Sequence, residues 1–146
     1  MRSATPLFLW LPAIAVAAHL VEEFVWPGGF AAWYRWYWPK RAASVTTRLL
    51  VIVNVILVVL ALLPPALGAT AYGYGYWLIV ASIGAANAVF HLWATFRRRV
   101  YSPGVVTGTL LYLPLAMFGY RELLAGGMAT AGTAAQAAVV GVGFHV

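Results

Sequence analysis

The chain has 146 residues, of which 64% are hydrophobic and only 8% are charged. A soluble domain carries about 25% charged residues, so this composition excludes an ordinary soluble protein and predicts an integral membrane protein. The net charge of +6 would suit nucleic acid in a soluble protein, but here the basic residues lie between apolar runs, where they face anionic lipid. We therefore expect no nucleic-acid partner. The absence of cysteine excludes disulfides and thiolate metal sites.

Five apolar runs follow one another, each close to the roughly 20 residues that a transmembrane helix needs. Turn-forming residues separate them, such as Pro64 and Pro65, which are expected to end the second helix. Residues 30–48 interleave tryptophan and tyrosine with arginine and lysine, which is typical of a segment at the membrane–water interface. We therefore predict one all-α transmembrane domain over 1–146, a bundle of about five helices with an interfacial segment after the first. The expected spans are 7–25, 49–67, 74–96, 105–124 and 128–145.

The basic residues are divided unevenly between the loops. The loop after the first span carries Arg35, Lys40, Arg41 and Arg48, and the loop after the third carries Arg97–Arg99, whereas the loop after the second carries none. By the positive-inside rule, the first and third loops are cytoplasmic and the N-terminus is outside. This orientation is the one expected of a protein in the cytoplasmic (inner) membrane.

The first span ends in His19-Leu20-Val21-Glu22-Glu23, which holds two of the three acidic residues of the chain. A helix turns about 100° per residue, so His19, Glu22 and Glu23 share one face. A charge inside a membrane costs on the order of 2.5–3.5 kcal/mol on insertion scales. Two adjacent carboxylates are therefore expected to be protonated, paired with a positive partner or bound to a metal ion.

Polar residues of the other spans fall at the same depth under this topology. His91 lies about one to two turns from the cytoplasmic end of the third span, and Asn87 lies about one turn deeper on the same face. Asn54 in the second span and Thr107 in the fourth each lie about one turn inside the membrane. His145 joins this level if the fifth span crosses.

This arrangement favours a metal site with His19, Glu22, Glu23 and His91 as ligands. Helix bundles build carboxylate metal sites from a histidine and a glutamate on one helix, completed from another helix. A divalent ion such as zinc, iron or manganese suits these ligands, and a spare carboxylate would act as general base on bound water. Glu22, Glu23 and His91 are thus the expected catalytic residues. Two alternatives stay open: metal-free proton transfer on a sterol-like or isoprenoid-like substrate, and a salt-bridge network that only holds the bundle together.

The motif H-x-x-E-E at His19, Glu22 and Glu23 resembles the signature of the HXXEE-motif family, small bacterial membrane proteins of unassigned function. The likeness extends to Asn87-Ala88-Val89-Phe90-His91, to Tyr101-Ser102-Pro103-Gly104 and to Thr107. It implies that the residues expected from topology are the signature of the family, and it supplies no reaction. The bundle is also similar to the emopamil-binding type of sterol isomerase, which is an analogy of architecture alone.

We therefore expect a metal-dependent membrane enzyme, a hydrolase or an oxidoreductase, that acts on a lipophilic small molecule or lipid near the cytoplasmic side. The residues expected to contact the substrate or support the metal ligands are Asn54, Asn87, Tyr101 and Thr107. The alternatives are a metal-free acid–base isomerase and a non-enzymatic small-molecule binding or transport protein. The nearly apolar outer halves of the first three spans argue against a pore. A homo-oligomer is compatible with these features.

Overall fold

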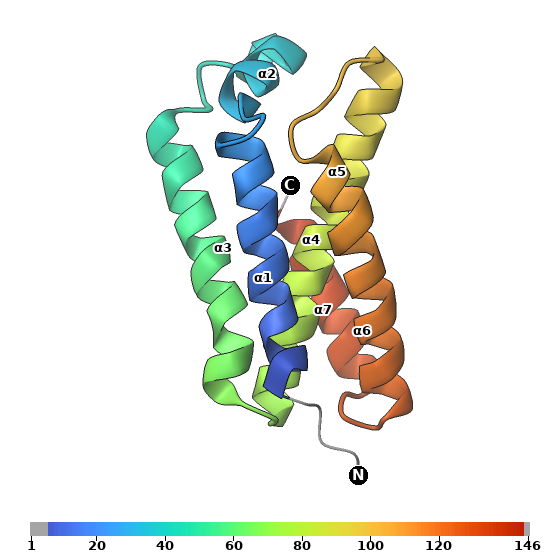
Figure 1. The fold of residues 1–146 in the computed structure, drawn as a ribbon. Coiled ribbons are helices and arrows are strands. Elements are labelled where there is room, and N and C mark those ends of the chain that lie inside the picture. Colours follow the sequence, from blue (N-terminus) through green and yellow to red (C-terminus); the bar gives the residue numbers. More distant parts are fainter. Residues whose placement is uncertain (1–5, 145–146) are drawn as a thin grey trace.

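The computed structural model describes residues 6–144, which are mostly helical and include no strand (Figure 1). His145 lies outside the described residues. Among them, three helices are long and apolar enough to cross a membrane: α1 (Pro6–Phe24), α3 (Thr47–Leu67) and α4 (Ala71–Arg98). Between α1 and α3 lie the short helix α2 (Phe30–Tyr37) and the 3₁₀ turn η1 (Pro39–Arg41). The chain continues through α5 (Val105–Thr107), the π-helical turn η2 (Gly108–Tyr112), α6 (Leu113–Ala125) and α7 (Ala131–Gly143).

The all-helical fold expected from the sequence is confirmed, and α1, α3 and α4 correspond to the first three expected spans. The fourth expected span, 105–124, is a run of α5, η2 and α6 without an intervening loop. Helix α7 has 13 residues, fewer than the roughly 20 that a crossing needs. The fourth and fifth crossings therefore stay predictions.

The expected end of the second span at residue 67 agrees with α3, but the expectation that Pro64 and Pro65 end this helix was wrong, as was the expected start of the third span. The pair Pro64–Pro65 lies inside α3, which continues to Leu67. Because these prolines lie near the end of the helix, their missing N–H groups remove only hydrogen bonds close to that end. Gly68 caps the helix, and its N–H donates to the carbonyl of Pro64. Helix α4 begins at Ala71 rather than near residue 74, because the Thr70 hydroxyl accepts the N–H of Gly73 at 3.1 Å and caps the first turn.

Helix α4 is the centre of the bundle and contacts α1, α3, α6 and α7. Near the start of α1, the Phe8 ring stacks on Trp77 of α4 with ring centroids 4.7 Å apart, and the Trp77 indole N–H donates to the Phe8 carbonyl at 2.9 Å. Gly119 of α6 faces the same indole, where a Cβ would lie 1.8 Å from a ring carbon. The absence of a side chain at Gly119 is therefore what allows α6 to pack against α4.

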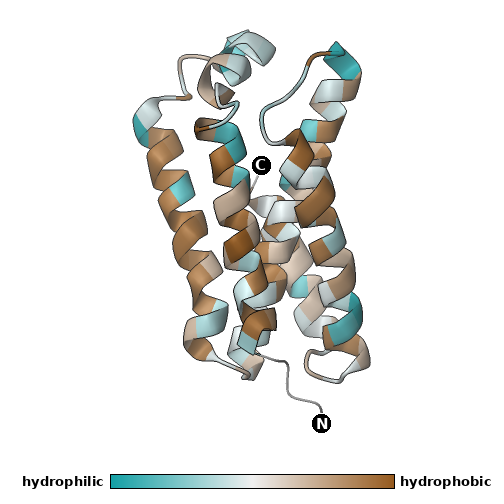
Figure 2. Cartoon of the chain, in the orientation of Figure 1, coloured by the Kyte–Doolittle hydropathy of each residue, from teal (hydrophilic) through white to brown (hydrophobic). Residues whose placement is uncertain are grey.

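The two ends of the bundle differ in charge. Helix α2, the start of α3 and the end of α4 lie at one end, and the α3–α4 and α6–α7 turns lie at the other (Figure 1). The basic residues of the segments 35–48 and 97–99 therefore gather at the α2 end. Figure 2 shows hydrophobic residues along most of the length of α1 and α3, with hydrophilic residues near the helix ends. Three apolar helices of this kind fit a membrane protein.

Candidate metal centre

Three ionisable side chains meet inside the bundle, two from α1 and one from α4. His19 and Glu23 lie one helical turn apart on α1, and His19 Nε2 is 3.4 Å from Glu23 Oε1. His91 of α4 places its Nε2 3.2 Å from the same oxygen. The residues are 1%, 4% and 0% exposed, respectively. We call His19, Glu23 and His91 the His–Glu–His cluster.

Two of the three separations in this cluster are close to the spacing of ligands on one metal ion. Zinc binds histidine nitrogen and carboxylate oxygen at about 2.0–2.2 Å, so two ligands of a tetrahedral site lie roughly 3.3–3.5 Å apart. The separations of 3.4 and 3.2 Å, both from Glu23 Oε1, are close to this spacing, and all three candidate ligand atoms lie within 4.8 Å of one another. In the described part of the chain, both Nε2 atoms and Glu23 Oε1 are buried without a hydrogen bond. Buried polar atoms rarely lack a partner, so the cluster suits a cation.

Hydrogen bonds behind the cluster determine which nitrogen of His19 carries the ring proton. The Thr107 hydroxyl donates its single proton to Glu22 Oε2, so it can only accept at His19 Nδ1, which is 2.8 Å away. In the neutral imidazole, Nδ1 then carries the proton and Nε2 presents a lone pair toward Glu23. His91 Nδ1 similarly lies 2.7 Å from the Ser102 hydroxyl. Metal-binding histidines are generally held through their second nitrogen in this way.

Glu22, although adjacent to Glu23, makes a different set of contacts. Its carboxylate accepts the backbone N–H groups of Val106 at 3.0 Å and Thr107 at 2.6 Å, and the Tyr101 hydroxyl at 2.6 Å. The first N–H groups of a helix have no partner within the helix and favour a negative charge. The structure therefore does not bring Glu22 to the cluster, where the sequence placed it as a fourth ligand. Glu22 connects α1 to the segment 101–107.

Tyr101 and Thr107, both expected near the site, thus act on it through Glu22 and His19. Burial of the Tyr101 phenol, together with its hydrogen bond to the Glu22 carboxylate and the charge of that group, raises the pKa of Tyr101 above its ordinary value. The phenol consequently keeps its proton and remains a donor to Glu22.

Gly104 closes one side of the cluster. Its φ angle is +103°, in the region that favours glycine. A Cβ at this position would lie 2.7 Å from Cε1 of His19 and 2.9 Å from Nε2 of His91. The backbone after α4 therefore packs directly against both imidazoles, and a larger residue would displace at least one of them.

The π-helical turn η2 brings a tyrosine to the cluster. Pro114 has no N–H to donate to the preceding turn, and the wide turn lies directly before it; such turns often occur at functional sites. The Tyr112 ring lies 4.6 Å from the His19 ring, centroid to centroid. On its other side it packs on Gly84 of α4, where a Cβ would lie 2.8 Å from the ring. Tyr112 is therefore held between α1 and α4.

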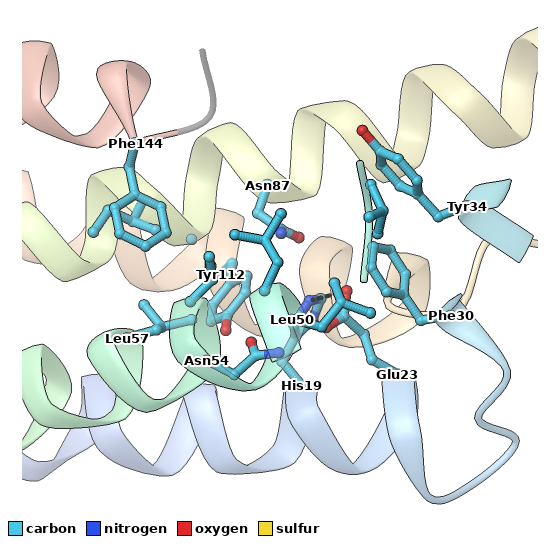
Figure 3. A pocket seen from close by; sticks show the side chains of 15 residues that line it. His19, Glu23, Phe30, Tyr34, Leu50, Asn54, Leu57, Asn87, Tyr112 and Phe144 are labelled. Carbon is cyan, nitrogen blue, oxygen red and sulfur yellow. Dashed lines mark ion pairs between the residues drawn. The ribbon is translucent and has the colours of Figure 1, made fainter. Parts of the chain in front are cut away.

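A cavity of about 210 Å³ adjoins the cluster. Asn54 from α3, Asn87 from α4 and Tyr112 from η2 point into it (Figure 3). Within the described range, Asn87 Oδ1 and the Tyr112 hydroxyl are buried without a hydrogen-bond partner, so both are free to bond to a ligand. The cluster and helix α2 contribute His19, Glu23, Phe30 and Tyr34 to the lining.

Sequence reasoning assigned no role to Ser102, Gly104 or Tyr112. Ser102 and Gly104 lie in a turn whose path across α1 and α4 follows from no helical periodicity. Pro114, two residues after Tyr112, is the one sequence signal for the irregular turn that places this tyrosine.

Comparison with known proteins gives one match. The family model described as "protein of unknown function with HXXEE motif" matches residues 10–119. The chain belongs to the HXXEE-motif family. The resemblance seen in the sequence is thus confirmed. Each of the three residues that define the motif makes specific contacts: His19 and Glu23 belong to the cluster, and Glu22 binds the start of α5. No curated protein and no solved structure matches the chain.

Proposed function

We propose that this HXXEE protein is a membrane enzyme that binds one divalent transition-metal ion at His19, Glu23 and His91. The observation that carries the proposal is the convergence of three buried ligand atoms that have no hydrogen-bond partner in the described residues. A lone pair on His19 Nε2 facing a carboxylate oxygen at 3.4 Å needs a positive species between them. A metal ion supplies it for all three side chains at once.

Two histidines and one carboxylate leave room for water or substrate on the metal. Zinc with this set of ligands activates water for hydrolysis, and iron(II) with open positions supports oxidation. The adjoining cavity offers the Asn87 amide and the Tyr112 hydroxyl as hydrogen-bonding groups for a substrate oxygen. In this proposal all three residues of the His–Glu–His cluster bind the metal, and Glu22 is a positioning residue because its carboxylate is occupied by hydrogen bonds from the start of α5.

The substrate proposed for this site is a lipophilic small molecule. The cavity lies within a bundle whose three longest helices are apolar, and its lining is largely hydrophobic. We place the protein in the cytoplasmic membrane with α2 and the α4–α5 loop on the cytoplasmic side, because the basic residues gather at that end. The metal centre then lies near the cytoplasmic face.

Elemental analysis of the protein purified in detergent without chelators tests the metal. We expect one zinc, iron or manganese ion per chain in the wild type, and none in His19→Ala, Glu23→Gln or His91→Ala. Glu122→Gln is the matched control: Glu122 is a half-exposed carboxylate of α6, 4.0 Å from exposed Arg121, and this variant should keep the ion. A wild type that holds no metal would exclude the metal enzyme and favour proton transfer between Glu23 and a histidine.

A further inference from the structure

A second hollow lies beside the metal centre, between α1 and α3. It has a volume of about 580 Å³ and is lined by apolar side chains such as Val21 of α1 and Val51, Val55 and Val58 of α3. Of the described residues that line it, only Thr47 and Asn54 have polar side chains. We call this hollow the α1–α3 groove.

The groove adjoins the cavity at the metal centre. Leu50 and Asn54, one helical turn apart on α3, line both spaces. Asn54 points into the cavity from α3 (Figure 3). These two side chains separate the groove from His19 and Glu23, so a molecule in the groove would enter the cavity by passing them.

The sizes of the two spaces restrict what can occupy them. Pockets that enclose a drug-sized ligand have about 300–1,000 Å³, so the cavity, with about 210 Å³, holds only the end of a larger molecule. The groove follows α3 from Thr47 to Val59, a helical rise of about 18 Å. This shape suits one flexible hydrocarbon chain and excludes a rigid fused-ring molecule from full burial at the metal.

The cavity lining indicates the chemistry of the end that enters it. Its polar groups include the amides of Asn54 and Asn87 and the hydroxyl of Tyr112, and among the described residues it contains no lysine or arginine. Amides and phenols bond well to an uncharged oxygen, whereas a phosphate would call for basic side chains.

We infer that the substrate is a single-chain lipid with a small uncharged oxygen-bearing end, represented in the test below by a long-chain alcohol, whose chain lies in the α1–α3 groove. Its oxygen reaches the metal centre past Asn54 and bonds to Asn87 or Tyr112. The inference rests on the proposed function for the chemistry at the oxygen, while the binding of the chain depends on the groove alone.

Photocrosslinking tests the inference on the full-length protein in phosphatidylcholine nanodiscs. The probe is a long-chain alcohol with a diazirine within its chain, and peptide mass spectrometry maps the adducts. We expect adducts concentrated on residues 20–25 and 50–59, removed by excess unlabelled alcohol and less readily by the alkane of equal length. Adducts spread evenly over the exposed apolar faces would overturn the inference, and equal competition by alcohol and alkane would overturn the role of the oxygen.

Two neighbouring tryptophan substitutions provide a matched pair. Val55, 56% exposed, lines the groove, whereas Ile56, 46% exposed, lines neither the groove nor the cavity. Val55→Trp should lower the crosslinking several-fold and Ile56→Trp should not; equal labelling of the two would contradict the proposal. Metal content is measured in the same samples. Metal without groove labelling would overturn this inference alone, and groove labelling without metal would overturn the proposed function alone.

Discussion

At the scale of single residues, Thr107 forms hydrogen bonds with two residues of the HXXEE motif, His19 and Glu22. Its hydroxyl donates to Glu22 and accepts from His19 Nδ1 at 2.8 Å, so it holds the His19 Nε2 lone pair toward Glu23, where the proposed metal would bind. Thr107→Val keeps the shape and removes this link. Loss of such a supporting partner typically weakens metal binding by about 10–100-fold, and we expect a change of this size in a competition titration with a chelating dye.

Thr107→Ser distinguishes positioning from packing. It restores the hydroxyl and loses a methyl group, so it should recover most of the affinity that Thr107→Val loses. If serine and valine weaken binding equally, the hydroxyl does not position His19.

Gly104 limits the space around both imidazoles. A Cβ would lie 2.7 Å from His19 and 2.9 Å from His91, at a φ of +103°. We therefore expect Gly104→Ala to displace a histidine and lose the metal, and to lower the free energy of unfolding by about 1–3 kcal/mol, as overpacking does. Metal content and thermal unfolding in detergent measure the two effects. Gly127→Ala, also at positive φ (+64°) but with nothing within 4 Å of its Cβ position, separates backbone strain from the clash; retention of full metal by Gly104→Ala would contradict the predicted contact.

The sequence predicted that His19, His91 and a neighbouring glutamate lie close together, but not which of the two glutamates contacts the histidines. His19, Glu23 and His91 follow from helix periodicity and a common depth in the membrane. Glu22 and Glu23 differ by about 100° around the same helix, and the rotation of α1 against the segment 101–107 decides which of them meets the histidines. That rotation depends on tertiary contacts such as the bonds of Glu22 to Val106 and Thr107, which no pattern within α1 contains.

At the scale of helices, the contact between α4 and α6 depends on one glycine. A Cβ at Gly119 would lie 1.8 Å from the Trp77 ring, and Trp77 is fully buried. Gly119→Ala should therefore lower the free energy of unfolding by about 1–3 kcal/mol. Gly143→Ala is the control: this α7 glycine has nothing within 4 Å of its Cβ position, and alanine should be neutral or stabilise the helix by up to about 1 kcal/mol.

Thermal unfolding of the two variants in the same detergent measures the difference. The metal centre lies away from Gly119, so the folded Gly119→Ala protein should still bind one ion. Equal midpoints for Gly119→Ala and Gly143→Ala would show that α6 can move away from Trp77 at little cost.

The helices themselves were largely predictable, because long apolar runs of about 20 residues have few other structures available to them. The residues at which these helices begin and end were harder to predict. Pro64 and Pro65 are compatible with a last helical turn, and Thr70 starts α4 earlier than the apolar run alone indicates. The π-helical turn at 108–112 depends on packing of Tyr112 between His19 and Gly84, which involves residues far apart in sequence.

At the scale of the whole molecule, orientation in the membrane decides from which side the candidate metal centre is reached. The basic segments 35–48 and 97–99, helix α2 and the metal centre all belong to one half of the bundle, and the turns around residues 69 and 126 belong to the other. The positive-inside rule therefore predicts that the metal centre opens toward the cytoplasm. A cytoplasmic opening would give it access to intracellular metal ions and soluble co-substrates.

The absence of cysteine makes this orientation directly measurable. Single substitutions Ser44→Cys, Ala69→Cys, Val100→Cys and Ala125→Cys place thiols at exposed positions in or beside the turns at the two ends of the bundle, without removing a charge. With a membrane-impermeant thiol reagent on intact cells, Ala69→Cys and Ala125→Cys should be labelled, and Ser44→Cys and Val100→Cys only after the cells are opened. The reverse pattern would place the metal centre at the outer face. Labelling of residues 100 and 125 from the same side would contradict the fourth crossing, because the uninterrupted helical run 105–125 separates them.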